Sequence, residues 1–119
     1  MPLNHLQKAR FLRNTLLKSP GSEVLLHGDL HHGNILHHKE WVVIDPKGVV
    51  GYPINEVWAF VMDMDRDIPF ISHACGFKLQ DVYDWYFVHL TLAASWNLQD
   101  NTDASLFLNL MNKAYNYVS

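Results

Sequence analysis

The sequence VLLHGDLHHGNILHHKEWVVIDPKG, residues 24–48, decides the fold of this chain. Its apolar runs 35–36 and 41–44 flank a polar segment, which predicts two strands joined by a turn. If Lys39-Glu40 forms a two-residue turn, Asn34 faces Asp45 across the hairpin, so that an amide oxygen lies beside a carboxylate. Mg²⁺ accepts such oxygen ligands and keeps room for water and phosphates. A longer loop would shift this register, because Lys-Glu is a poor two-residue turn.

Asp29 lies five residues before Asn34, in a loop that contains Gly28 and Gly33. A carboxylate at this place could take the proton of a substrate hydroxyl while a metal ion holds phosphates, as in phosphoryl transfer. An aspartate in a glycine-containing loop ordinarily caps a turn. The combined spacing Asp-x4-Asn-x10-Asp favours the functional interpretation.

Histidines are concentrated in the same stretch and suggest a second kind of site. Imidazole groups bind zinc and iron, so a histidine-rich metal-dependent hydrolase is an alternative. The order His-x-Asp-x-His-His differs from the His-x-His-x-Asp-His order of metallo-β-lactamase-like hydrolases, and further ligands would have to come from His73 or His89. The five clustered histidines are His27, His31, His32, His37 and His38.

The remainder of the chain is predicted to be mainly helical. Apolar residues recur at steps of three and four in residues 3–18 and 80–98, which predicts two amphipathic helices. Residues 54–62 also look helical, whereas residues 63–69 look like a loop. Asn101 or Thr102 would cap a final helix. The predicted fold class is α+β, mostly helical with a small antiparallel hairpin.

Composition excludes several classes of protein. Of the 119 residues, 49% are hydrophobic and 18% are charged, which excludes disorder of the highly charged type. The single cysteine, Cys75, excludes an internal disulfide framework. Four basic and no acidic residues lie in residues 1–20, whereas the rest of the chain has five basic and twelve acidic residues. This acidic body argues against nucleic acid and suits a cationic small molecule. Without a run of about 20 apolar residues we expect no membrane span and a cytoplasmic protein.

The motif HGDLHHGNIL at residues 27–36, followed by IDPKG at residues 44–48, resembles the catalytic core of aminoglycoside phosphotransferase-type kinases. The run Asp-Pro-Lys-Gly-Val-Val-Gly is most similar to the streptomycin-kinase branch, the aminoglycoside/hydroxyurea resistance kinases. The resemblance implies a protein-kinase-like fold, ATP and Mg²⁺ as cofactors, and O-phosphorylation of a small-molecule hydroxyl. The resemblance further implies that Asp29 is the catalytic base and that Asn34 and Asp45 are the metal ligands. It implies a supporting role in the loop for His27, Gly28 and Gly33.

The chain departs from the family pattern after the metal-binding aspartate. Gly51-Tyr52-Pro53 has lost an acid that family members commonly carry, and Glu56 stands where a second acid often lies. These acids mostly hold the loop in place. In the resembled kinases an acidic surface receives cationic aminoglycosides, which makes four residues candidate substrate contacts: Glu56, Asp63, Asp65 and Asp67.

The larger departure is that no glycine-rich phosphate loop and no strand lysine precede His27. We therefore expect residues 1–119 to be the catalytic, C-terminal lobe of a longer kinase without its nucleotide lobe, and to be inactive or weakly active alone. The alternative is a natural short protein that serves as a non-catalytic interaction module. Either form would expose apolar side chains near the catalytic rim, so we expect a symmetric homodimer.

Overall fold

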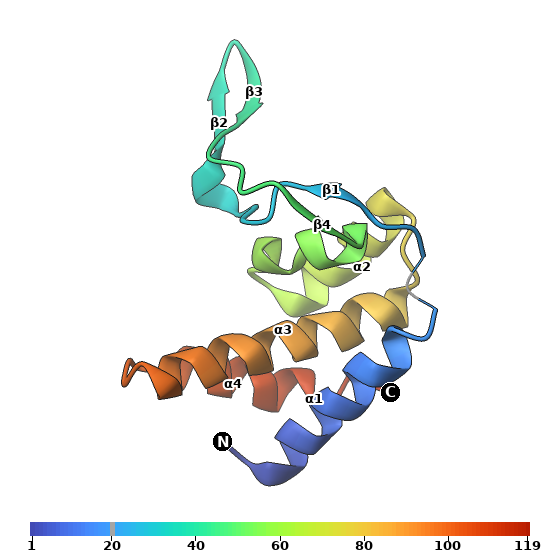
Figure 1. The fold of residues 1–119 in the computed structure, drawn as a ribbon, viewed down its shortest axis with the longest axis vertical. Helices are drawn as coiled ribbons and strands as arrows, with labels where there is room; N and C mark the ends of the chain where they lie inside the picture. Colours follow the sequence, from blue (N-terminus) through green and yellow to red (C-terminus); the bar gives the residue numbers. More distant parts are fainter. Residues whose placement is uncertain (20) are drawn as a thin grey trace.

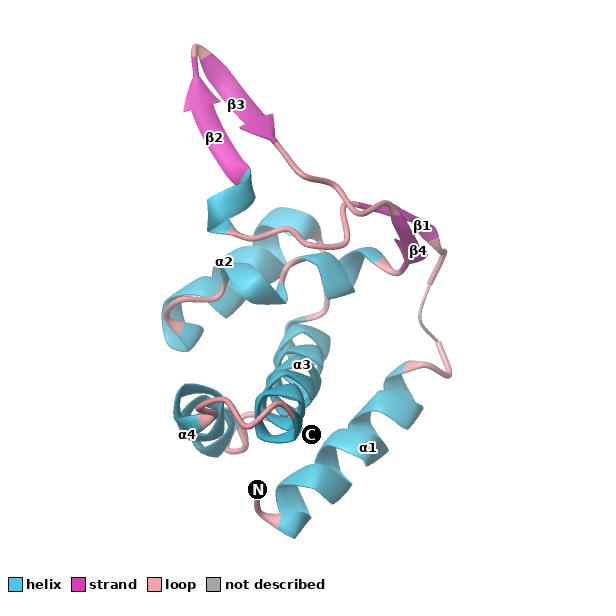
Figure 2. Ribbon diagram, turned by 60° about the vertical axis from the view of Figure 1, so that its left-hand side comes forward, coloured by secondary structure: helices cyan, strands magenta, loops and turns pink. Residues whose placement is uncertain are grey.

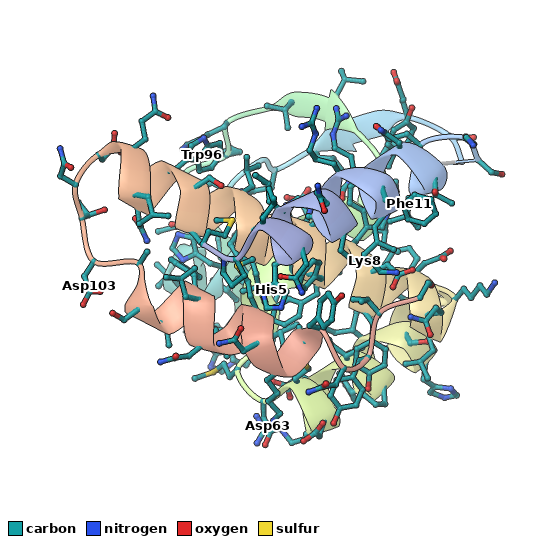
Figure 3. The ribbon with its side chains drawn as sticks, turned by 90° about the horizontal axis from the view of Figure 1, so that it is seen from below. His5, Lys8, Phe11, Asp63, Trp96 and Asp103 are labelled. Carbon is teal, nitrogen blue, oxygen red and sulfur yellow. The ribbon has the colours of Figure 1, made fainter. Side chains whose placement is uncertain are left out.

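The computed structural model describes residues 1–19 and 21–119, and its helical part is organised around α3 (Leu79–Gln99). Helix α1 (Leu3–Leu16) packs on one flank of α3, and α4 (Ser105–Ala114) packs on another (Figures 1 and 3). Apolar side chains at helical spacing form the common core. Its largest fully buried side chains are Leu12, Ile68, Phe87, Leu90 and Met111. The predictions of helices at residues 3–18 and 80–98 are confirmed.

The segment predicted as a loop, residues 63–69, is instead the start of helix α2 (Met64–Cys75). Asp63 caps this helix, because its carboxylate accepts hydrogen bonds from the N–H groups of Asp65 and Arg66. Pro69 lies inside the helix and removes one backbone donor there. Burial of Met64, Ile68 and Ile71 against α3 compensates for that loss.

Two separate two-stranded antiparallel sheets carry the motif region. Strands β1 (Val24–Leu26) and β4 (Val49–Gly51) pair with Leu25 opposite Val50. Strands β2 (Ile35–His38) and β3 (Glu40–Val43) form a hairpin that projects away from the helices (Figures 1 and 2). These sheets and the helices together confirm the α+β class.

The predicted register of the hairpin is wrong by one residue. Ile35 pairs with Val43 and not with Ile44, so Asn34 does not face Asp45 as a ladder partner. Lys39 alone connects the paired residues on its two sides and adopts a left-handed φ of 66°. One tight residue at the tip therefore replaces the expected Lys39-Glu40 turn.

Two smaller predictions need correction. Residues 54–62 form two short 3₁₀ turns, η2 (Pro53–Glu56) and η3 (Trp58–Phe60), and not one helix. Neither Asn101 nor Thr102 caps α4, because Asp103 accepts the hydrogen bond of the Ser105 N–H at 2.9 Å. No helix in the described part of the chain combines the length and the hydropathy of a membrane span.

Candidate active site

The loop that carries Asp29 is held by the side chain of Glu56. One oxygen of the Glu56 carboxylate accepts a hydrogen bond from the His27 N–H at 2.8 Å, and the other accepts one from the Gly28 N–H at 3.0 Å. Turn η2 places Glu56 at this point, after β4 has paired with β1. Two charge-assisted bonds from one carboxylate fix the start of the loop.

His27 braces the loop a second time through its ring. Nδ1 accepts a hydrogen bond from the Asp29 N–H at 3.2 Å, so the proton lies on Nε2, which donates to the Ile44 carbonyl at 2.6 Å. The ring thereby links the loop to the end of β3. The supporting role implied for His27 fits this geometry, because both ring nitrogens bond to backbone atoms.

The two glycines of the loop allow close approaches. Gly28 has a left-handed φ of 88°, and a Cβ at this position would lie 3.1 Å from Val49 Cγ2 and 3.2 Å from Lys47 Cβ. A Cβ on Gly33 would lie 2.8 Å from the ring of His31, which accepts the Gly33 N–H. A side chain at position 28 would crowd Val49 and Lys47 in a left-handed backbone, whereas one at position 33 would push the His31 ring aside.

Asn34 is buried directly behind Asp29. Its amide nitrogen donates to the Asp29 carbonyl at 2.8 Å and lies 3.5 Å from the Asp29 carboxylate, and the residue is 7% exposed. The Asn34 carbonyl accepts the Ile44 N–H at 2.9 Å, which ties β2 to the end of β3. The structure therefore brings Asp29 and Asn34 together, as the spacing predicted.

Asp45 follows Ile44 at the base of the same hairpin and has a left-handed φ of 54°. Among the described residues, no hydrogen bond joins the side chains of Asn34 and Asp45. The Asn34 amide nitrogen is engaged by Asp29, which leaves its oxygen as the acceptor of that group. An amide oxygen and a carboxylate fit Mg²⁺, which takes few protein ligands besides water and phosphate oxygens.

The clustered histidines do not converge as a metal centre. His31 accepts the Gly33 N–H, and His32 lies 3.4 Å from the Phe60 carbonyl. The His37 ring packs at a tilt against Trp41 in the projecting hairpin. No group of three or more His, Cys, Asp or Glu side chains in the described part of the chain could hold a metal ion. The side chain of His38 lies outside the described structure. This arrangement gives no support to the hydrolase alternative.

A basic residue that the motif analysis did not select lies beside Asp29. The Lys47 ammonium is 3.7 Å from an Asp29 carboxylate oxygen, and the Lys47 N–H donates to the His27 carbonyl at 2.7 Å. The position of Lys47 in the sequence, directly after Pro46, gave no reason to expect its ion pair with Asp29. The fold creates it, because β4 returns along β1 and brings the preceding residues back to the loop.

Asp29 and Lys47 border a cavity of about 770 Å³ between α1, β4 and α3. Its volume lies within the range of small-molecule sites. The wall is largely apolar and aromatic, and α1 adds positive charge. Side chains that give it this character are Arg10, Arg13, Trp58, Trp85 and Trp96.

The acidic residues at the start of α2 lie away from this cavity wall. Asp65 bonds the Tyr117 hydroxyl at 2.7 Å and the Lys113 ammonium at 3.1 Å, and both contacts lower the pKa of Asp65. The Arg66 guanidinium and the N–H groups of Asp63 and Met62 hold the pKa of Asp67 well below its usual value. These contacts stabilise the start of α2 and connect it to the C-terminal segment.

A braced aspartate, a buried asparagine and a following aspartate thus lie together on one loop and the base of one hairpin. A family model described as aminoglycoside/hydroxyurea antibiotic resistance kinase matches residues 3–101. The chain therefore belongs to that kinase family, and the resemblance found in residues 27–48 is confirmed.

Among curated proteins, the streptomycin 6-kinase of Streptomyces glaucescens is 26% identical over 105 residues. The alignment covers 75% of this chain and 34% of that protein, so the chain spans about a third of the length of the curated relative it matches. No solved structure matches the chain.

Proposed function

We propose that residues 27–45 form the catalytic centre of an ATP- and Mg²⁺-dependent O-phosphotransferase that acts on a hydroxyl of a small molecule. The observation that carries the proposal is the double bracing of the Asp29 loop by Glu56 and His27. The loop backbone is held while the Asp29 side chain stays 41% exposed and borders the cavity. A general base needs this combination of fixed position and access.

In the proposed reaction Asp29 accepts the proton of the acceptor hydroxyl, and the oxygen of that hydroxyl attacks the γ-phosphorus of ATP. The new O–P bond forms while the bond to ADP breaks, and ADP leaves with that electron pair. Mg²⁺, held by Asn34 and Asp45, would neutralise negative charge on the nucleotide phosphates. Asn34 also fixes the backbone of Asp29 through its amide nitrogen.

For the acceptor we propose an aminoglycoside, with streptomycin the first to test because the curated relative is named a streptomycin 6-kinase. The cavity beside Asp29 offers the space. Asp63, Asp65 and Asp67 lie outside the wall of this cavity, so we propose them as contacts for a part of a cationic acceptor that extends beyond it. Both oxygens of Glu56 already bond the loop, so we propose a positioning role for that residue.

We further propose that residues 1–119 form the catalytic lobe of a kinase-like fold and work in the cytoplasm, where ATP is available. The alternative of a non-catalytic interaction module makes the opposite prediction for turnover. A transfer assay with ATP, Mg²⁺ and streptomycin, on the protein at the full length that its gene encodes, separates the two.

The decisive variant is Asp29→Asn, with the exposed Asp100→Asn as a matched control. Loss of a general base lowers turnover by about 10²–10⁴-fold. We expect that loss for Asp29→Asn alone, with an unchanged melting temperature. Equal turnover in both variants would contradict the assignment of Asp29, and an inert wild-type protein would favour the interaction module.

A further inference from the structure

The backbone of Lys47 is fixed by a hydrogen bond, whereas its side chain is exposed to solvent. Its N–H donates to the His27 carbonyl at 2.7 Å, and its Cβ lies against Gly28. The side chain is nevertheless 66% exposed, and its ammonium is 3.7 Å from the Asp29 carboxylate. The result is an exposed cation on a fixed backbone beside the proposed base.

The place of this cation matters because phosphoryl transfer brings negative groups together. A base accepts a proton over about 2.6–3.2 Å, and the attacking oxygen lies about 3–3.5 Å from the phosphorus. A phosphoryl group under attack therefore lies about 6 Å from the Asp29 carboxylate. The Lys47 ammonium, 3.7 Å from the same carboxylate, can reach that distance by turning about its four-carbon stem. A lysine is a compact point charge on a flexible stem, suited to follow such a group.

Other cations near Asp29 meet these conditions less well. His31 Nε2 is 3.9 Å from the carboxylate, but an unprotonated imidazole brings no charge. Arg10 and Arg13 border the cavity from α1, on exposed sites, and make no ion pair with Asp29 within the described structure.

We propose that Lys47 is a second catalytic residue, which contacts the phosphoryl group during its transfer from ATP to the acceptor. This inference rests on the proposed phosphotransferase function. The Lys47 ammonium pairs with Asp29 before the donor is present and then bonds the oxygens of the transferred group, where negative charge accumulates. It exchanges no proton: the hydroxyl proton passes to Asp29, and ADP leaves with the electron pair of the broken P–O bond.

The test compares Lys47→Met, Lys47→Arg and the control Lys78→Met, an exposed lysine that lies outside the cavity wall. Removing one group that stabilises the transition state costs about 10²–10³-fold in kcat. We expect that loss for Lys47→Met, a partial recovery for Lys47→Arg, an unchanged KM for the acceptor and no effect of Lys78→Met. An unchanged kcat in Lys47→Met would overturn the proposal.

A binding experiment tests the same contact without turnover. Calorimetry with Mg²⁺ measures the affinity for a non-hydrolysable ATP analogue and for ADP, which differ by the terminal phosphoryl group. We expect Lys47→Met to weaken analogue binding about tenfold and to leave ADP binding unchanged. Equal losses for both nucleotides, or none for either, would contradict the contact.

The two experiments separate failure of this inference from failure of the proposed function. Suppose that the wild-type protein transfers no phosphoryl group, but that the Lys47→Met variant binds the ATP analogue more weakly than the wild type does. The contact then stands and the transferase function is wrong. If the wild type is active and Lys47→Met matches it, the function stands and the role of Lys47 is wrong. A wild-type protein that binds neither nucleotide overturns both.

Discussion

Glu56 bonds the backbone of His27 across 29 residues of sequence, with 2.8 Å between its carboxylate oxygen and the His27 nitrogen. The same carboxylate holds the Gly28 N–H. The position of Asp29 thus depends on a turn that belongs to a different part of the chain. The acid at position 56 serves the loop as the family resemblance implied, and the structure shows how.

Replacing Glu56 by Gln should weaken this support. The amide keeps one acceptor but points a donor at one of the two N–H groups. Loss of one hydrogen bond in this partly exposed loop costs about 0.5–1.5 kcal/mol. We expect a lower melting temperature and a lower kcat, with little change in the KM for ATP. Glu40→Gln in the exposed hairpin is the control. A Glu56→Gln protein as active as the control would show that the loop holds without the brace.

Gly28 and Gly48 offer a matched pair for the close approach in the loop. Both have left-handed φ, 88° and 64°, but a Cβ on Gly28 would meet Val49 and Lys47, whereas Gly48 faces open space. Ala at Gly48 should cost about 1–2 kcal/mol for the backbone conformation alone. Gly28→Ala should cost more and also reduce turnover. Chemical denaturation gives the difference, and equal free energies of unfolding would argue against crowding at Gly28.

The stability of the protein should depend on pH through His89. Burial lowers the pKa of His89 to about 4, while its Nε2 donates to the Asn55 side chain and its ring stacks on Trp58. An unfolded histidine titrates near pH 6.5, so the unfolded state binds more protons between pH 6.5 and 4. Stability is fully present above pH 6.5 and falls as the pH drops toward 4, by about 3 kcal/mol at most.

Urea denaturation of the wild type and His89→Gln at pH 7 and pH 4.5 checks this dependence. Glutamine keeps a donor for Asn55 and cannot be protonated, so the variant should lose less stability on acidification. The exposed His73→Gln serves as control and should follow the wild type. The same loss in all three proteins would place the acid sensitivity elsewhere.

Removing charge at Asp63, Asp65 and Asp67 tests the proposed acceptor contacts. Asparagine at position 63 preserves the helix cap, so the triple Asn variant changes charge more than structure. We expect the KM for a cationic acceptor to rise about fivefold, in line with exposed ion pairs, and the KM for ATP to stay constant. The control is a triple variant that removes the three negative charges of Glu40, Asp81 and Asp100 instead. If only the melting temperature changes, these residues serve helix α2 and not the acceptor.

Self-association should depend on the β1–β4 sheet. Leu25 and Val50 are cross-strand partners and are 75% and 68% exposed, which leaves an apolar patch next to the loop. We expect sedimentation to show a dimer, and Leu25→Glu with Val50→Glu to make it monomeric. Leu106→Glu on α4, also exposed, should leave the dimer intact. A wild-type monomer at high concentration would contradict the expected homodimer.

Periodicity predicted the long helices because their apolar residues face one core. It missed α2, since alternating aspartates and Pro69 look like a loop, and only tertiary burial of Ile68 and its neighbours favours the helix. The hairpin was predicted but not its register. A lysine gives no sequence signal for the left-handed φ that Lys39 adopts at the tip.

At the site, local spacing was enough to associate Asp29 with Asn34, because five residues of one loop separate them. The ion pair of Lys47 with Asp29 could not be predicted in this way. It depends on β1 and β4 pairing at a distance in sequence, and a motif read along the chain contains no information on that pairing. Glu56 was selected as a candidate, but its two partners are backbone groups, which every residue possesses.

The brace between Glu56 and the loop also sets an order of events during synthesis. The ribosome adds about 5–20 residues per second, so residues 27–34 leave it well before Glu56 does. Until Glu56 emerges and η2 docks, the His27 and Gly28 N–H groups lack the carboxylate that holds them in the folded protein. The catalytic motif, though contiguous in the gene, therefore becomes a defined shape only after the downstream chain has folded back beneath it.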